Sequence, residues 1–148
     1  MQTFLPFRAF ALSAKVLDDK RLGKQRVEAW QIYECLIYGG AWQNHPAVKQ
    51  WRGYEQALLA YGVAICTEWV GRGFRDIMRE RFFDRRQGDI IYPPWLGNSR
   101  FHDSHKQRLY QKDPVYYAAF KDAVAEPCCP GCTYYWPTHD RTFDSRTS

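Results

Sequence analysis

The chain has 148 residues, 45% of them hydrophobic and 25% charged, with a formal charge of +5. This size and composition fit one globular domain with its own core and argue against a disordered chain. No run of about 20 apolar residues is present and the N-terminus lacks a secretory signal, so we expect a cytoplasmic protein without a membrane span. The positive charge and a high aromatic content of 17% are compatible with a nucleic-acid partner.

Hydrophobic periodicity and turn residues predict an all-α fold with five to six helices in a single domain over residues 1–140. An extended N-terminal segment ends at Pro6, because proline disfavours helix in the residue before it. Helices are predicted over 8–17, 21–38, 46–51, 54–70, 74–86 and 99–113, with a further short helix opened by Pro114. A loop is expected over 88–99, an irregular C-terminal loop from Pro127 and a frayed tail over 141–148.

The longest predicted helix begins at a cap formed by Asp18 or Asp19 and ends at Gly39 and Gly40. One buried stripe recurs at helical spacing and comprises Leu22, Ala29, Tyr33 and Leu36; the polar side carries Arg21, Lys24, Glu28 and Gln31.

Glu28 is a candidate functional carboxylate, because the basic side chains on its helix keep it ionised and attract phosphates. Glutamate and lysine three or four residues apart are also a common solvated pair with a weak interaction, and this alternative stays open.

His102 and His105 are three residues apart on a helix, next to Lys106. Their shared face favours contact with an anion, although two buried structural histidines explain the spacing equally well. A metal site needs more ligands than this pair supplies.

The segment CCPGC places Cys129 and Cys132 at the spacing of half a zinc site, with His139 as a third candidate ligand and Cys128 beside them. Since structural zinc usually takes two such pairs, we expect a tight turn with free thiols and no metal. An odd total of five cysteines also argues against a disulfide framework.

Trp51, Arg52 and Trp95 combine aromatic rings with basic or flexible neighbours, which suits base stacking. Burial in the core is the default explanation for any single tryptophan.

Several motifs, in fixed order along nearly the whole chain, resemble a bacterial and phage branch of the pyrimidine-dimer DNA glycosylase family. They are MQTFLPF, LDDKRLGKQRVEAWQI, NHPAVKQWRGYEQAL, PPWLG, HDSHKQRL, KDPVYY and YYWP. The resemblance implies an all-α fold, no cofactor and a duplex DNA substrate with a damaged or modified pyrimidine. It also implies a reaction in which the N-terminal α-amine attacks sugar C1′, the base leaves, and β-elimination of the imine nicks the strand. We expect a monomer.

Carried over by its spacing of six from Leu22, the family's catalytic glutamate falls on Glu28, and Arg26 matches an arginine that contacts phosphate or sugar. The expected DNA-binding residues are Arg21, Lys24, Arg26, His45, Trp51, Arg52, Trp95, His102, His105 and Lys106.

The N-terminus departs from the family pattern, because Gln2 follows Met1 and so large a side chain normally prevents removal of the methionine. The nucleophile is then the amine of Met1, or of Thr3 after unusual trimming. If neither acts, the protein is a monofunctional glycosylase in which Glu28 activates water. A non-catalytic nucleic-acid-binding module and a zinc-dependent hydrolase stay open as alternatives.

Overall fold

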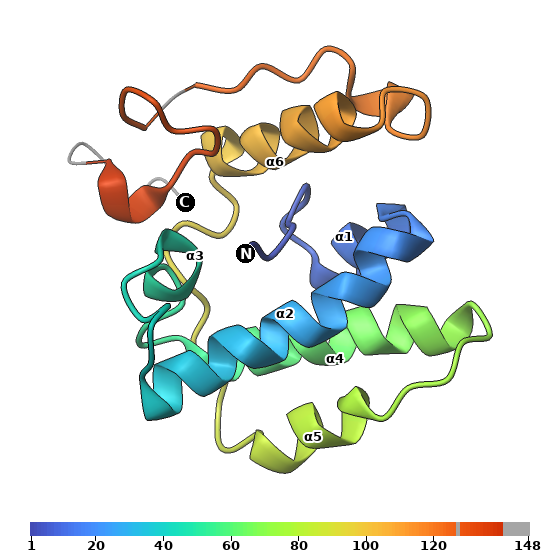
Figure 1. Cartoon of the computed structure of the whole chain (residues 1–148), viewed down its shortest axis with the longest axis vertical. Coiled ribbons are helices and arrows are strands. Elements are labelled where there is room, and N and C mark those ends of the chain that lie inside the picture. The colour runs from blue at the N-terminus through green and yellow to red at the C-terminus, as the bar shows by residue number, and fades with distance from the viewer. Residues whose placement is uncertain (127, 141–148) are drawn as a thin grey trace. The chain divides into compact units, whose positions relative to one another are not determined.

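The computed structural model describes residues 1–126 and 128–140, and every regular element in these residues is helical (Figure 1). The predicted all-α class is confirmed. Backbone contacts group the chain into two compact units. The first comprises Met1–Thr3 and Ala9–Pro93, and the second comprises Phe4–Arg8 and the residues from Pro94 onward. The expected frayed tail over 141–148 lies outside the described residues.

The first unit contains the helices α1 (Phe10–Val16), α2 (Asp19–Tyr38), α3 (Pro46–Lys49), α4 (Glu55–Gly71) and α5 (Met78–Arg85). Helices α2 and α4 pack along each other, and α1 and α5 both pack on α4. Their shared core is formed by Leu22, Ala29, Ile32, Leu58, Leu59, Ile65 and Phe82, all completely buried.

The ends of α2 follow from its sequence. The carboxylate of Asp18 accepts a hydrogen bond from the Arg21 backbone N–H, which satisfies one of the free donors of the first turn. Gly39 ends the helix with φ of 75°, a conformation that favours glycine. Leu22, Ala29 and Tyr33 are buried as predicted, because their spacing keeps them on one face.

Gly62 on α4 permits a close approach of α5. A Cβ atom at this position would overlap the aromatic ring of Phe82 on α5. The absence of a side chain at Gly62 therefore allows the ring to lie flush against the α4 backbone.

The second unit contains α6 (Ser99–Lys112) and two 3-10 helices, η1 (Ala118–Phe120) and η2 (Pro137–His139). The side chain of Asn98 caps α6 by accepting from the backbone N–H groups of Arg100 and Phe101. The helix predicted to open at Pro114 is wrong in its start and type. Asp113 ends α6, and its carboxylate accepts from the Tyr116 N–H. A turn therefore follows Asp113, and the next helical element is the short 3-10 helix η1 in place of an α-helix.

No helix in the described part of the chain is long and apolar enough to cross a bilayer.

Candidate active site

The first residues of the chain meet α2 at Glu28. The backbone N–H of Gln2 donates to Oε2 of Glu28 over 3.1 Å. The α-amine of Met1 is separated from that nitrogen by only three covalent bonds. Residues 26 positions apart in sequence are thereby joined, and the carboxylate is held at the residue that follows the amine-bearing Met1.

A buried glutamine one turn earlier on α2 fixes this arrangement. Nε2 of Gln25 donates to the carbonyl of Gln2 over 2.8 Å and also lies 3.4 Å from Oε2 of Glu28. The Tyr61 hydroxyl on α4 donates to Oε1 of Gln25 over 2.7 Å. Since this bond occupies the carbonyl oxygen of the amide, its NH2 group must face Gln2 and Glu28.

Thr3 anchors the next position of the N-terminal segment. Its hydroxyl oxygen accepts from the indole N–H of Trp51 over 3.0 Å, and its backbone N–H donates to Oε1 of Gln2 over 2.8 Å. Thr3 and Trp51 are both completely buried. The structure therefore favours the core alternative for Trp51 over base stacking.

The other oxygen of Glu28 forms the ion pair expected from helical spacing, with Nζ of Lys24 at 3.5 Å. The side chain of Lys24 is 72% exposed and that of Glu28 only 14%, so the lysine contributes little stability. The carboxylate of Glu28 therefore does more than form a solvated ion pair, because its second oxygen accepts a hydrogen bond from the N-terminal segment.

The charge of the N-terminus acts electrostatically on His45. Burial, followed by the positive charge of the Met1 ammonium group, lowers the pKa of His45. Its Nδ1 accepts from the Ala47 N–H over 3.0 Å and caps α3. The ring of Trp42, 56% exposed, lies 6.0 Å from the imidazole. His45 is therefore within range of the charge of the N-terminus, and the exposed ring of Trp42 lies next to this imidazole.

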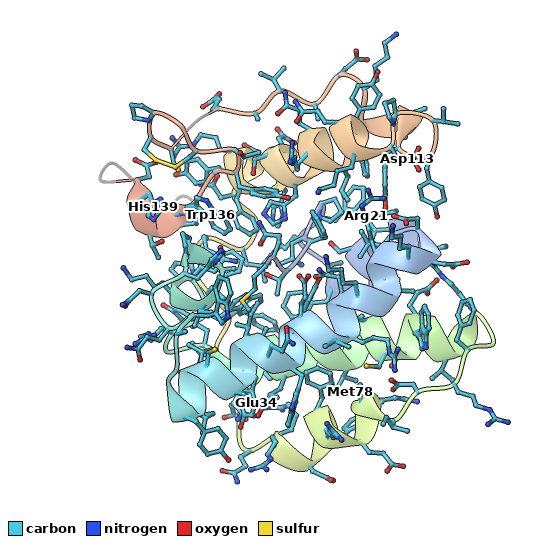
Figure 2. The ribbon with its side chains drawn as sticks, viewed as in Figure 1. Arg21, Glu34, Met78, Asp113, Trp136 and His139 are labelled. Atoms are coloured by element: carbon cyan, nitrogen blue, oxygen red, sulfur yellow. A yellow bond between two sulfur atoms is a disulfide. The ribbon has the colours of Figure 1, made fainter. Side chains whose placement is uncertain are left out.

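The basic residues expected to contact DNA have different surroundings. Lys24 and Arg52 are exposed, and Arg52 donates to the carbonyl of Gln43 over 3.0 Å. Arg21 pairs with Asp18 at the first turn of α2, where Figure 2 labels it.

Arg26 is held inside the first unit. Its Nε donates to Oδ1 of Asp76 over 2.8 Å, and its guanidinium lies 4.9 Å from the centre of the Trp69 ring. Burial acts to raise the pKa of Asp76, but the N–H groups of Met78 and Arg79 and the Arg26 guanidinium outweigh it and lower that pKa. The structure therefore gives Arg26 an acidic partner within the protein, and its contact with phosphate or sugar stays a prediction.

His102 and His105 hold the backbone of Leu5 within the second unit. Nδ1 of His102 lies 2.7 Å from the Leu5 carbonyl, and the Leu5 N–H donates to Nδ1 of His105 over 2.9 Å. The Gly97 N–H donates to Nε2 of His102 over 2.8 Å, so the proton of this neutral ring is on Nδ1. The structure favours the buried structural alternative for both histidines over an anion-contacting face.

Two other residues expected at the DNA interface also belong to the second unit. Trp95 is 3% exposed and packs on Phe101, so it too is a core residue. Lys106 is partly exposed; its ammonium group lies 4.8 Å from the centre of the Phe7 ring and 3.7 Å from the carboxylate of Asp103.

The histidine pair predicts a loss of stability in acid. Burial is the largest cause that lowers the pKa of His102 and, to a greater degree, that of His105. The unfolded chain binds protons below the ordinary value of 6.5 while the folded chain does not, so the free energy of unfolding falls as the pH decreases. The expected slope below pH 6.5 is up to about 1.4 kcal/mol per pH unit for each histidine, to which His45 adds in the same direction.

Chemical denaturation at several values between pH 5 and pH 7 measures this slope. A free energy of unfolding that stays constant over this range would contradict the assignment of both rings as neutral in the folded protein.

Gln25, Tyr61 and Trp42 were not among the site residues predicted from the sequence. Gln25 precedes Glu28 by three positions on the same helix, and this spacing is the one signal that pointed to it. Tyr61 lies in the helix predicted over 54–70, and nothing in its sequence surroundings indicates that its hydroxyl has a polar partner.

Comparison with protein families now adds to this geometry. Residues 1–80 match pyrimidine dimer DNA glycosylase, a match that covers more than half of the chain and includes Met1, Gln25, Glu28, His45 and Tyr61. The chain belongs to the pyrimidine dimer DNA glycosylase family. Membership supports a DNA glycosylase, and hence an enzyme with a DNA substrate. No curated protein and no solved structure matches the chain.

Proposed function

We propose that the protein is a bifunctional DNA glycosylase and abasic-site lyase that acts on damaged or modified pyrimidines with the α-amine of Met1 as nucleophile and Glu28 as the catalytic carboxylate. The observation that carries the proposal is the 3.1 Å hydrogen bond between the Gln2 N–H and Glu28, within the residues that match the family.

The amine is suited to this reaction. As a class, α-amines are less basic than lysine side chains, so they supply a neutral nucleophile more readily near neutral pH. In the proposed reaction it bonds to C1′ of the sugar as the glycosidic bond breaks, and the departing base takes up a proton. The C1′–O4′ bond of the sugar then breaks, O4′ takes up a proton, and a protonated imine forms between the amine and C1′. Loss of a C2′ proton forms the C2′–C3′ double bond as the C3′–O bond breaks and the 3′ phosphate leaves. Water finally hydrolyses the unsaturated imine and frees the amine.

In the proposed reaction Glu28 serves both stages. Its carboxylate, 14% exposed, stabilises positive charge that develops on the sugar and then accepts the C2′ proton. Gln25 positions it, because the same amide donates to Glu28 and to the carbonyl of Gln2.

Met1 is favoured over Thr3 as the source of the amine. The backbone nitrogen of Thr3 already donates to Gln2, and its side chain is buried under Trp51. Trimming to Thr3 would remove the Gln2 nitrogen that contacts Glu28 and the carbonyl that Gln25 binds.

The exposed side chains near this site suit a bent duplex with an extruded nucleotide. Lys24 and Arg52 offer positive charge, and the exposed ring of Trp42 next to His45 offers a stacking surface. Trp42 takes the role in base stacking that the sequence suggested for Trp51 and Trp95.

Borohydride reduction tests the proposal directly. The purified protein is incubated with duplexes that carry an abasic site, a pyrimidine dimer or a modified pyrimidine, and a reduced imine is detected as a covalent protein–DNA complex. Acetylation near pH 7, where the α-amine reacts in preference to lysines, is expected to abolish this complex. Intact-mass and peptide analysis verify that residue 1 is methionine and is the modified position.

Each alternative gives a different result. Base release without a trapped complex would leave a monofunctional enzyme in which Glu28 activates water. A complex that persists after acetylation would assign the nucleophile to a lysine, and DNA binding without base release or nicking on any duplex would indicate a non-catalytic module.

A further inference from the structure

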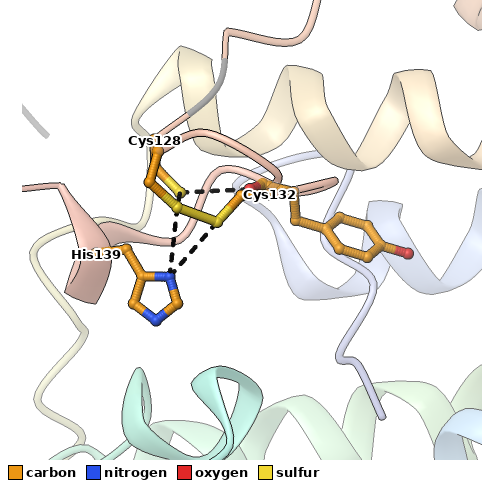
Figure 3. Close-up of a disulfide and its surroundings, with 5 residues drawn as sticks. Cys128, Cys132 and His139 are labelled. Carbon is orange, nitrogen blue, oxygen red and sulfur yellow. Dashed lines mark hydrogen bonds between the residues drawn. A yellow bond between two sulfur atoms is a disulfide. The ribbon is translucent and has the colours of Figure 1, made fainter.

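Four side chains of the second unit that can bind a metal converge in the segment after Pro127. They are Cys128, Cys129, Cys132 and His139, and their ligand atoms all lie within 4.8 Å of one another (Figure 3). Cys129 and Cys132 are joined by a disulfide bond, so the expectation of free thiols is wrong for this pair. Cys128, which was not among the three ligands expected from the sequence, supplies the fourth.

Three of the distances between these atoms are close to the edges of a zinc tetrahedron, whereas the bonded sulfurs of Cys129 and Cys132 must separate on reduction before both can bind one ion. Zinc binds sulfur at about 2.3 Å and imidazole nitrogen at about 2.0 Å, which places two sulfurs about 3.8 Å apart and a sulfur and a nitrogen about 3.5 Å apart. Sγ of Cys128 and Sγ of Cys129 are separated by 3.7 Å. Nδ1 of His139 lies 3.7 Å from Sγ of Cys132 and 3.9 Å from Sγ of Cys129.

The backbone presents these ligands through two short turns. The Cys132 N–H donates to the Cys129 carbonyl over 3.2 Å, and Gly131 adopts φ of 82°, which closes the loop between the cysteines. Pro137 begins η2, and the His139 N–H donates to the Trp136 carbonyl, so the imidazole returns to the sulfurs. This cluster is therefore formed by local chain geometry.

We propose that Cys128, Cys129, Cys132 and His139 form a Cys3His zinc site when the cysteines are reduced. A thiol reductant converts the Cys129–Cys132 disulfide to two thiols and is itself oxidised to a disulfide. Each of the three thiols then releases a proton as its sulfur binds Zn2+, and neutral His139 binds through Nδ1. Four protein ligands leave no open position, so the site is structural and does not support a zinc-dependent hydrolase.

The zinc would fix the irregular segment to α6. Asp140, next to His139, accepts from the Tyr135 hydroxyl and pairs with Arg100 of α6 at 3.4 Å. The Arg100 guanidinium also lies 4.8 Å from the centre of the Tyr135 ring. A metal bound to both Cys128 and His139 would close the loop between them. Arg100 of α6 already contacts Tyr135 and Asp140 near the end of this loop.

Metal content of the full chain, purified with a thiol reductant and dialysed against metal-free buffer, tests the site. One zinc per chain is expected, and Co2+ in its place should give thiolate charge-transfer bands and the visible absorption of tetrahedral cobalt. Cys132→Ser and His139→Ala should each lower the bound zinc at least tenfold. Cys35→Ser, which changes a half-exposed free cysteine of the first unit, is the matched control and should retain it.

The proposal would be overturned if the reduced protein bound no zinc and showed no thiolate–cobalt absorption after addition of Co2+. Zinc retained at one per chain by both Cys132→Ser and His139→Ala would overturn it as well. Since metal content is read without any DNA assay, these outcomes are independent of the proposed glycosylase activity.

Discussion

Glu28→Gln is expected to lower the single-turnover rate of base release and strand nicking by about 10²- to 10⁴-fold, the range that one acid–base group contributes. Glutamine retains an oxygen that accepts from the Gln2 N–H, so the N-terminal segment keeps its anchor. It lacks the negative charge that we propose stabilises the sugar and the basicity that we propose removes the C2′ proton. The rate is measured with enzyme in excess over a duplex that the wild-type protein cleaves.

Glu34→Gln is the matched control, because Glu34 lies exposed on the same helix, where Figure 2 labels it, and the substitution removes the same charge. Its rate should stay within about twofold of wild type. If both variants lost activity equally, long-range attraction of DNA would explain the effect, and Glu28 would have no specific role.

Asp76→Ala is expected to destabilise the first unit by about 3 to 5 kcal/mol, the cost of breaking a buried ion pair by removing one partner. The side chain of Asp76 is completely buried and that of Arg26 is 15% exposed, so the guanidinium would lose its partner away from water. The variant also loses the acceptor for the Met78 and Arg79 N–H groups at the start of α5. Urea denaturation measures the change.

Asp84→Ala removes an exposed carboxylate from α5 and should change stability by less than about 0.5 kcal/mol. A double variant, Arg26→Met with Asp76→Ala, should be less destabilised than the sum of its two single changes, since neither charge is left unpaired. Additive effects would show that the pair does not interact in the folded protein.

Local chemistry made α2 and α6 predictable from sequence. Asp18 and Asn98 are N-cap residues, Gly39 adopts a conformation open to glycine, and the apolar stripe between these signals has helical spacing. The same local rules placed Glu28 on the partly exposed side of α2.

Partner choice was not predictable, because it depends on residues far apart in sequence. Arg26 and Lys24 are both basic residues of α2, yet Asp76 lies 50 positions from Arg26 and binds it, whereas Lys24 extends into solvent. Likewise, tryptophan and histidine serve equally in a core and at a DNA interface. Only the contact of Trp51 with Thr3, and those of the two histidines with Leu5, distinguish the roles.

The amide of Gln25 gives the site a polarity that does not change with pH. Tyr61 supplies a donor to its oxygen, and the carbonyl of Gln2 and the carboxylate of Glu28 both lie at its nitrogen. A glutamate in place of Gln25 would instead present a carboxylate oxygen to the Gln2 carbonyl and to the Glu28 carboxylate. Neither of these groups can donate a hydrogen bond to that oxygen unless a proton is added. Because an amide neither gains nor loses a proton between acid and alkaline conditions, Gln25 can hold the start of the chain in one register across that range.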